Sequence, residues 1–567
     1  MQRIEKFLDK YWWIIVVVLS IPAFWVLLVP GFYGASDDLH IGWLYQMHQT
    51  LMSGKIPPRF VPDLSFGFGY PLFNFVFPLP FYIAEIFHLL GLSLVDSIKM
   101  LFFLSIPLSG FSMYFLLRQF GNVWLSLSGA ILYIYTPYRA VDIYIRGAIG
   151  EIISFVFLPL ILLSIIKIFQ GVSTRWIGIG ALSLASLVLS HNITAYMFFP
   201  FIFLFAAMMV FFIGSQKTRK AVNLFLTFFL GLLISAYFWL PALVESKLIK
   251  YDTVFNFADH FPTIRQLITP YWGYGASVPG PNDGMSFFLG ISNILVLILG
   301  VFSLFFHFKK YSINERVIVI WSLISSMAAV FLMNYRSGLI WQNIPLLPYF
   351  QFPWRFLVMT TVCIPILVIS LKYFKLTHVV AILMIALTIT TSAYYFKPQD
   401  FLGRKDDYYL NRYIPTPVAS SEYLSTKEEY LRLPIYTRIR PDRNFPLVLF
   451  QDGQIKNASK INDLDTRLEV ISENGGRLDY NKYFFPGWSV KVDGTTTDIE
   501  PGKPFGQISL QVPAGFHQIE ITFKETPPKI FLDSISLIGF ILALLLVLRI
   551  DLFNPVKSGK IRGGHQI

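Results

Sequence analysis

The chain has 567 residues, of which 54% are hydrophobic and only 14% are charged. Soluble domains carry about 25% charged residues, so this composition excludes an ordinary soluble protein. The net charge of +12 lies mostly in short loops between apolar runs, which argues against a nucleic-acid partner, and the single cysteine, Cys363, excludes both a disulfide framework and a thiolate metal site.

Long apolar runs separated by short polar segments predict a polytopic α-helical membrane protein, because a crossing needs about 17–25 apolar residues. The first run could instead be a signal peptide cleaved near Ala35, but it is longer than a usual signal sequence. We expect about twelve crossings: Tyr11–Pro30, Ser97–Leu117, Val123–Pro137, Ile152–Ile168, Ile177–Leu189, Ala195–Ile213, Ala221–Leu243, Met285–Phe306, Val317–Met333, Phe356–Leu371, Thr377–Tyr394 and Ile530–Leu548.

The run Tyr70–Leu92 is ambiguous, since it is broken by three prolines and carries Glu85 and His88. If it does not cross, alternate loops carry the basic residues, which is the positive-inside pattern with both chain ends in the cytoplasm. The basic clusters are then Arg118, Lys167 with Arg175, Lys217 to Lys220, Lys309 to Arg316, Lys372 with Lys375, and Lys557, Lys560 and Arg562 in the tail. We therefore place this run in the first outer loop, 31–96.

The same sidedness puts five polar clusters at one outer face: 36–40, 138–151, 190–192, 245–284 and 352–355. Ionisable groups at membrane depth are costly and are functional candidates by default. Asp37 and Asp38, with His40 nearby, could provide a general base or oxygen ligands for Mg²⁺ or Mn²⁺. They could also simply cap the helix predicted to follow them.

Asp142 and Arg146 are four residues apart and would share one helical face, with Glu151 entering the next span. Arg146 could grip a phosphate, because guanidinium matches phosphate geometry, or the three charges could only pin a loop.

The remaining candidates lie at the ends of two later spans. His191 and Asn192 could bind a sugar or phosphate, or His191 could be structural. Arg355, after Trp354, could neutralise a leaving phosphate or extend to the membrane surface.

Charged residues and turn signals return from about residue 397 to 528, where short runs alternate apolar and polar residues. The turns Asp493-Gly494 and Pro513–Gly515 indicate hairpins. We predict an outer β-sandwich at 397–528, joined by stalks at both ends to a transmembrane domain, 1–396, and to a last helix with a cytoplasmic tail, 529–567. No nucleotide-binding loop, zinc-protease motif or serine-hydrolase motif is present in the sequence.

Several motifs together resemble the bacterial YfhO-like membrane proteins, including those labelled as related to pyruvoyl-tetrahydropterin synthase. They are Ser36–His40, Gly54–Pro57, Gly67–Asn74, Pro78–Tyr82, Tyr135–Arg139, Tyr144–Glu151, Ser190–Asn192, Phe352–Arg355 and Tyr483–Trp488 with Val492–Gly494. The resemblance implies a GT-C-type glycosyltransferase in the bacterial cytoplasmic membrane. Such enzymes take a sugar from a polyprenyl-phosphate carrier at the outer face and use acidic residues of the first two outer loops.

On that resemblance we expect inverting transfer to a cell-envelope glycan, lipid or protein acceptor. Asp37, Asp38 and Glu151 would be catalytic, and His40, Asp142, Arg146, His191, Asn192, Trp354 and Arg355 would bind substrate. The second outer loop has no Asp-x-Asp pair, so the requirement for a metal stays open. Two other functions also stay open: a transporter or flippase of lipid-linked glycan, and a non-catalytic scaffold whose β-domain binds a glycan or a partner.

Overall fold

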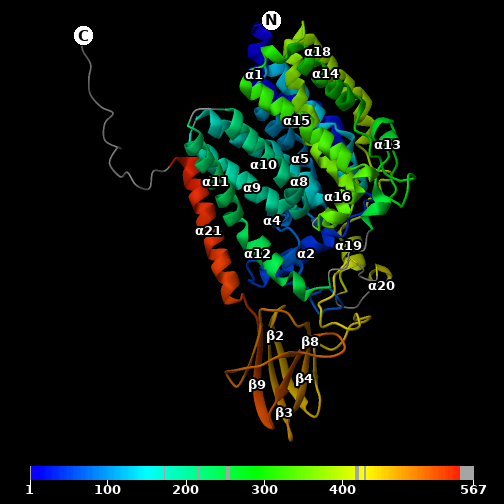
Figure 1. Cartoon of the computed structure of the whole chain (residues 1–567). Coiled ribbons are helices and arrows are strands. Elements are labelled where there is room, and N and C mark those ends of the chain that lie inside the picture. The colour runs from blue at the N-terminus through cyan, green and yellow to red at the C-terminus, as the bar shows by residue number, and fades with distance from the viewer. Residues whose placement is uncertain are drawn as a thin grey trace, which may run out of the picture.

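A computed structural model describes residues 2–171, 173–213, 216–250, 256–345, 347–415, 420–426 and 430–549. Figure 1 shows a long bundle of helices with a β-sheet domain below one end and the N-terminus at the other. The predicted basic tail, with Lys557, Lys560 and Arg562, lies outside the described residues, as does the stretch 251–255 of the predicted loop 245–284.

Nine helices of the described chain are long and apolar enough to cross a membrane. They are Arg3–Leu28 (α1 and η1), Leu94–Leu117 (α5), Ile149–Gln170 (α8), Asn192–Phe212 (α10), Ile291–Lys310 (α14 and η5), Ile313–Leu332 (α15), Pro353–Tyr373 (η8, α17 and η9), Thr377–Tyr395 (α18 and η10) and Pro527–Leu548 (α21). A tenth would be the pair α11 (Lys217–Ile234) and α12 (Ala236–Glu245), which is bent by 66°. The chain is therefore a multi-pass membrane protein, as predicted.

Two of the twelve predicted crossings correspond to shorter helices. The first is α6 (Val123–Ile134), with 12 residues, and the second is α9 (Arg175–Ser190), with 16. A full crossing needs about 20 residues. Every residue of α6 except Trp124 is buried among other helices. The structure thus gives nine or ten full-length crossings in the described chain rather than twelve.

The ambiguous run Tyr70–Leu92 does not form one helix. It contains α3 (Leu72–Phe75) and α4 (Leu79–Leu89), separated at Pro78, and neither is long enough to cross. Glu85 on α4 is buried and accepts a hydrogen bond at 2.8 Å from His48 on α2 (His40–Met52). As predicted, this segment forms no crossing and packs on α2, while its place on the outer side stays a prediction.

Short elements complete the helical part. They are α7 (Pro137–Val141), η2 (Asp142–Arg146), η3 (Ser246–Leu248), η4 (Phe257–His260), α13 (Ile264–Ile268), η6 (Tyr335–Ser337), α16 (Gly338–Asn343), η7 (Leu347–Phe350), α19 (Asp406–Tyr413) and α20 (Ser421–Thr426). Figure 1 places α2, α4, α12 and α19 toward the β-sheet domain. We call this the sheet-side end of the bundle.

The sheet domain consists of two antiparallel sheets that enclose one apolar core. The strands are β1 (Val448–Phe450), β2 (Gln454–Asn462), β3 (Asp465–Ser472), β4 (Gly476–Tyr483), β5 (Trp488–Val492), β6 (Thr495–Thr497), β7 (Glu500–Pro501), β8 (Gln507–Val512) and β9 (Gly515–Phe523). One sheet has the order β1-β4-β8-β7 and the other β2-β3-β9-β5-β6. The predicted sandwich is present, but its strands begin at Val448. The helices α19 and α20 lie in the earlier part of the range 397–528 that was assigned to it.

One of the two predicted hairpins is confirmed. Asp493 and Gly494, with φ of 50° and 80°, join the paired strands β5 and β6, as a two-residue hairpin turn requires. The prediction for Pro513–Gly515 is wrong, because β8 and β9 lie in different sheets. A turn signal alone does not distinguish a hairpin from a connection between two facing sheets.

The sheet domain is not held by two stalks alone, because the first outer loop also packs into it. Phe60 and Phe68 belong to its apolar core. Lys482 on β4 is buried and donates hydrogen bonds of 2.8 Å to the carbonyls of Pro62 and Gly67. Burial lowers the pKa of Lys482 to about 8, and these two acceptors partly replace the lost water.

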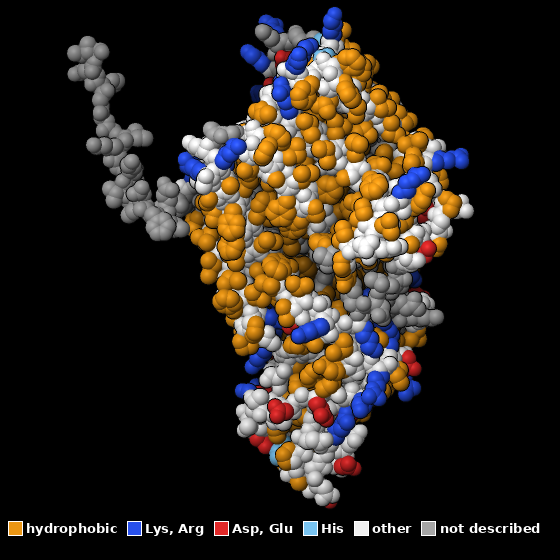
Figure 2. Space-filling view, in the orientation of Figure 1, with side chains coloured by type: hydrophobic (Ala, Val, Ile, Leu, Met, Phe, Trp, Pro, Cys, Tyr) orange, Lys and Arg blue, Asp and Glu red, His pale blue; other side chains and the backbone are white. Residues whose placement is uncertain are grey.

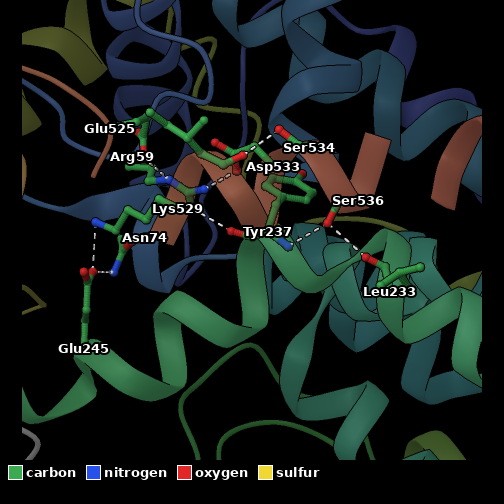
Figure 3. A network of polar contacts seen from close by, with 11 residues as sticks. Arg59, Asn74, Leu233, Tyr237, Glu245, Glu525, Lys529, Asp533, Ser534 and Ser536 are labelled. Atoms are coloured by element: carbon green, nitrogen blue, oxygen red, sulfur yellow. Dashed lines mark hydrogen bonds and ion pairs between the residues drawn. The ribbon is translucent and has the colours of Figure 1, made fainter. Parts of the chain in front are cut away.

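Figure 3 shows a network of charges where the loop, the sheet domain and α21 meet. Arg59 is 2% exposed and pairs with Glu525 at 3.0 Å and Asp533 at 2.5 Å, and it donates to the carbonyl of Tyr237 at 2.7 Å. Next to it, Lys529 pairs with Glu245 at 3.0 Å. The network joins the loop 31–96 to α12, to α21 and to the short segment between the last strand and α21.

We predict that Arg59→Ala loosens this junction, because it leaves two carboxylates partly buried without their cation. Breaking a buried pair in this way costs about 3–5 kcal/mol. Hydrogen–deuterium exchange of segment 54–60 in detergent-solubilised protein should rise about 100-fold or more. Arg467→Ala is the matched control, since its pair with Glu520 is exposed by 63% and 44% and should contribute little. Equal exchange in both variants would contradict this role for Arg59.

Candidate functional site

Two loops that are far apart in the sequence run side by side at the sheet-side end. The backbone N–H groups of Ser36 and Asp37 donate to the carbonyls of Ile145 and Arg146 at 2.9 and 2.7 Å. Gly147 adopts a φ of +69°, and a Cβ there would lie 3.1 Å from that of Ala35. This close approach holds Asp37 beside the turn that carries Arg146.

Arg146 is the centre of a buried charge cluster. Its Nη1 lies 2.5 Å from the Asp142 carboxylate, 3.1 Å from the Glu151 carboxylate and 3.1 Å from the Tyr138 hydroxyl. Tyr138 in turn donates to Glu151 at 2.5 Å. The predicted contact of Asp142 with Arg146 is therefore present, within a π-helical turn of the kind often found at functional sites.

The cluster leaves part of the Arg146 guanidinium available. Within the described chain, its Nε and Nη2 donate no hydrogen bond to another residue. Its plane lies over the ring of Trp354, 5.0 Å from the ring centre. Trp354 itself is fixed by a hydrogen bond of 3.1 Å from its Nε1 to Ser277, so the loop that contains Ser277 also reaches the site.

Arg355 brings a second guanidinium to the same place. Its Nη1 donates to the Phe350 carbonyl at 3.1 Å, and its Nε is buried without a hydrogen-bond partner among the described residues. None of the described carboxylates forms an ion pair with it. Arg355 lies within electrostatic range of both Arg146 and Glu151. Two neighbouring guanidiniums with donors left over form a site suited to an anion such as phosphate.

His191 lies against this cluster and caps a helix. The backbone N–H of Thr194 donates to His191 Nδ1 at 3.2 Å, which leaves the proton on Nε2. Burial lowers the pKa of His191 to about 3, so the ring is neutral near pH 7. A Cβ on Gly150 would lie 2.4 Å from the Ser190 carbonyl, so only glycine allows α8 to approach this corner. Asn192, by contrast, is exposed outside the cluster.

His40 holds the two loops together. Its ring lies near the backbone of Gly147 and contacts the rings of Trp43 and Phe81 at 5.3 and 5.8 Å. Burial lowers the pKa of His40, so it too is neutral near pH 7. This arrangement makes His40 a residue that positions the loop of Asp37.

Asp37 and Asp38 lie in different surroundings. Asp37 is half-buried and within electrostatic range of Arg146, Arg355 and His40. Asp38 is buried, accepts a hydrogen bond from Tyr413 on α19 and lies 4.0 Å from Arg404. Burial raises the pKa of Asp38, although Tyr413, Arg412 and Arg404 oppose this change. Of the two aspartates, therefore, only Asp37 lies near Arg146 and Arg355.

Three residues near the site were not among the candidates predicted from the sequence. Tyr138 lies in a family-like motif, so its place in an outer loop could have suggested it. Tyr413 lies in the stretch assigned to the sandwich, where no pattern indicates contact with Asp38. Arg139 is 1% exposed, stacks on Tyr133 and Phe155 at 5.2 and 5.1 Å, and has two guanidinium nitrogens without hydrogen-bond partners in the described chain.

The described residues contain no group of three or more His, Cys, Asp or Glu side chains that could hold a metal ion. The carboxylates of Asp37 and Asp38 have different neighbours, because the Tyr413 hydroxyl donates a hydrogen bond to Asp38. The Mg²⁺ or Mn²⁺ site at these two residues stays a prediction, and no chemical step below depends on it.

Comparison with solved structures finds two transferases at low sequence identity. The archaeal oligosaccharyltransferase AglB from Archaeoglobus fulgidus, in complex with an inhibitory peptide and a dolichol-phosphate, matches 74% of this chain and 58% of its own, with 12% identity and a TM-score of 0.45. The arabinofuranosyltransferase AftD from Mycobacteria matches 69% of this chain and 27% of its own, with 14% identity and a TM-score of 0.42.

Sequence comparison finds an uncharacterized protein of Lactococcus lactis subsp. cremoris (strain MG1363). It is 25% identical over 257 residues, which are 43% of this chain and 42% of that protein. A family model described as a 6-pyruvoyl-tetrahydropterin synthase related domain, membrane protein, matches residues 73–398, more than half of the chain. By this match the chain belongs to the family of 6-pyruvoyl-tetrahydropterin synthase related membrane proteins, the group that its motifs resemble.

Proposed function

We propose that the protein is a glycosyltransferase that moves a sugar from a polyprenyl-phosphate donor to a hydroxyl group of a cell-envelope acceptor at the outer face of the bacterial cytoplasmic membrane. The observation that carries the proposal is the arrangement of Asp37, Arg146 and Arg355 at one end of the helices. A carboxylate that can take a proton lies within electrostatic range of two guanidiniums with free donors, which is what attack by a hydroxyl and departure of a phosphate require.

In the proposed reaction, Asp37 takes the proton of the acceptor hydroxyl as its oxygen attacks the anomeric carbon. The bond from that carbon to the phosphate oxygen breaks, and the electron pair leaves with the lipid phosphate. Attack from the face opposite the phosphate inverts the configuration. Arg146 and Arg355 stabilise the negative charge that develops on the leaving oxygen, in a site from which much of the water is excluded.

The other residues position these groups. Glu151 and Asp142 hold Arg146 in place at 3.1 and 2.5 Å, and Tyr138 bridges Arg146 and Glu151. Trp354 lies beneath the Arg146 guanidinium. His191 presents its Nε2–H as a neutral donor for a sugar or phosphate oxygen. Glu151 is thus a positioning residue in this proposal rather than the base.

The lipid-phosphate donor is supported by the lack of carboxylate partners for Arg355 in the described chain. Arg355 is half-buried and its Nε is buried without a partner in the described chain, so an anion that binds beside it would complete the site. The phosphate of a lipid-linked sugar provides this anion at the membrane surface, where the site lies. AglB was solved with a dolichol-phosphate, which is a lipid phosphate of the same chemical class.

The direct test is to incubate the purified protein in nanodiscs with polyprenyl-phosphate hexose or pentose and with cell-envelope extract as the acceptor. Transfer should release free polyprenyl phosphate and label an acceptor. A transporter or flippase would move the intact lipid-linked sugar, and a scaffold would leave it unchanged. Either result across the donor panel would contradict the proposed function.

We predict that Asp37→Asn lowers the rate of transfer by about 10²–10⁴-fold, because the general base is lost. Asp38→Asn is the matched control, since its amide oxygen can still accept the Tyr413 hydrogen bond, and it should retain activity within about tenfold. Both rates are measured on variants whose melting temperature equals that of the wild-type protein. A larger loss in the Asp38 variant would reverse the assignment of the base.

We predict that Arg355→Gln lowers the turnover number by about 10²–10³-fold through lost stabilisation of the leaving phosphate. Arg355→Lys should recover part of this loss, because it keeps the charge but not the planar guanidinium. Arg336→Gln, at an exposed position in η6, should leave turnover unchanged. Equal turnover in Arg355→Gln and Arg336→Gln would exclude Arg355 from catalysis.

A further inference from the structure

A groove of about 750 Å³ opens beside the candidate site, which is within the usual size range of small-molecule sites. It lies between the start of α10, the helix α12 and the short helix η7. Its walls carry five aromatic rings: Tyr196, Phe238, Trp239, Tyr349 and Phe350. The groove is therefore built for a bulky apolar group.

The groove opens toward the surroundings of the bundle. Leu243 and Tyr349 on its walls are 66% and 46% exposed. Figure 2 shows the apolar side chains that cover this side of the helical bundle. Because such a surface faces lipid in a membrane protein, a hydrophobic chain can enter the groove sideways.

The chain bends at Ser235, just before the helix that lines the groove. The bend turns α12 by 66° from α11, and α12 then packs on α21 and α3. Lys529 on α21 and Asn74 on α3 both contact Glu245 at the end of α12, as Figure 3 shows. The wall of the groove is thus fixed by the same charge network that anchors the sheet domain.

Two lining residues place the groove next to the site. Asn192 lines the groove and directly follows His191 in the chain. Phe350 lines it as well, and the Phe350 carbonyl accepts the hydrogen bond from Arg355. A chain lying along the groove would therefore bring a group at its end close to Arg355.

We propose that this groove binds the isoprenoid chain of the lipid-phosphate donor, with the phosphate directed toward Arg355; the inference rests on the proposed function. Among the described residues that line the groove, Lys247 alone carries a charge, and it is positive, which complements an anionic lipid. The rigid aromatic walls favour a branched chain over the thin acyl chains of bulk phospholipids.

The test uses labelling rather than sugar transfer. Wild-type protein in nanodiscs is irradiated with a polyprenyl monophosphate that carries a diazirine near its phosphate end. Peptides that contain 192–196 and 349–350 should be labelled. Ala242→Trp fills the groove and should lower this labelling about tenfold. Val244→Trp lies on the same helix but outside the groove lining, with Val244 59% exposed, and should not change it.

Lys247→Gln provides a second readout if Ala242→Trp does not fold. It should weaken labelling by polyprenyl monophosphate but not by the uncharged polyprenol with the same diazirine. Equal labelling of the groove by a diazirine-bearing dioleoyl phosphatidylglycerol would overturn the isoprenoid assignment, as would unchanged polyprenyl monophosphate labelling in a folded Ala242→Trp variant.

The two proposals fail in different ways. Groove labelling that Ala242→Trp blocks, together with no sugar transfer from any donor, would overturn the proposed function and keep the groove as a lipid-phosphate site. Sugar transfer with labelling confined to other peptides would overturn the groove assignment and keep the function.

Discussion

The placement of Arg146 is the constraint on which the candidate site depends. A guanidinium buried at the end of a helical bundle must be surrounded by acceptors, because the free-energy cost of burying it unpaired is several kcal/mol. Asp142, Glu151 and Tyr138 provide these acceptors through Nη1. The other edge remains available, and the loop of Asp37 is bonded to the backbone at this same turn. The position of Arg146 therefore sets where Asp37, Arg355 and His191 come together.

The membrane class and most of the crossings could be predicted, because apolar length is a local property of the sequence. The two shorter helices could not. Whether α6 needs about 20 residues depends on whether it faces lipid, and its burial among neighbouring helices is a property of the tertiary structure. The hairpin at Asp493-Gly494 was predictable from its turn residues, whereas the link at Pro513–Gly515 depends on which sheet receives the next strand.

At the site, sidedness alone grouped Asp37, Arg146, His191 and Arg355 correctly at one end of the bundle. It could not separate Asp37 from Asp38, because adjacent residues have the same sequence context and only the contact with Tyr413 distinguishes them. It also could not show that Asn192 is exposed while its neighbour His191 is buried near Glu151, Arg355 and Arg146. These differences arise from side-chain direction and from contacts between residues more than 300 positions apart.

The loop 31–96 links the candidate site to the sheet domain. Near its start, Asp37 is bonded to the turn of Arg146, and farther along, Arg59 and the carbonyls of Pro62 and Gly67 are held by α21 and β4. The sheet domain is therefore in direct contact with the loop that carries Asp37. The same charge network also holds α12, one wall of the lipid groove, through Lys529 and Glu245. The sheet domain is thus joined by packed contacts both to the loop of Asp37 and to the helix that forms one wall of the proposed groove, so it is packed against this loop rather than tethered at a distance.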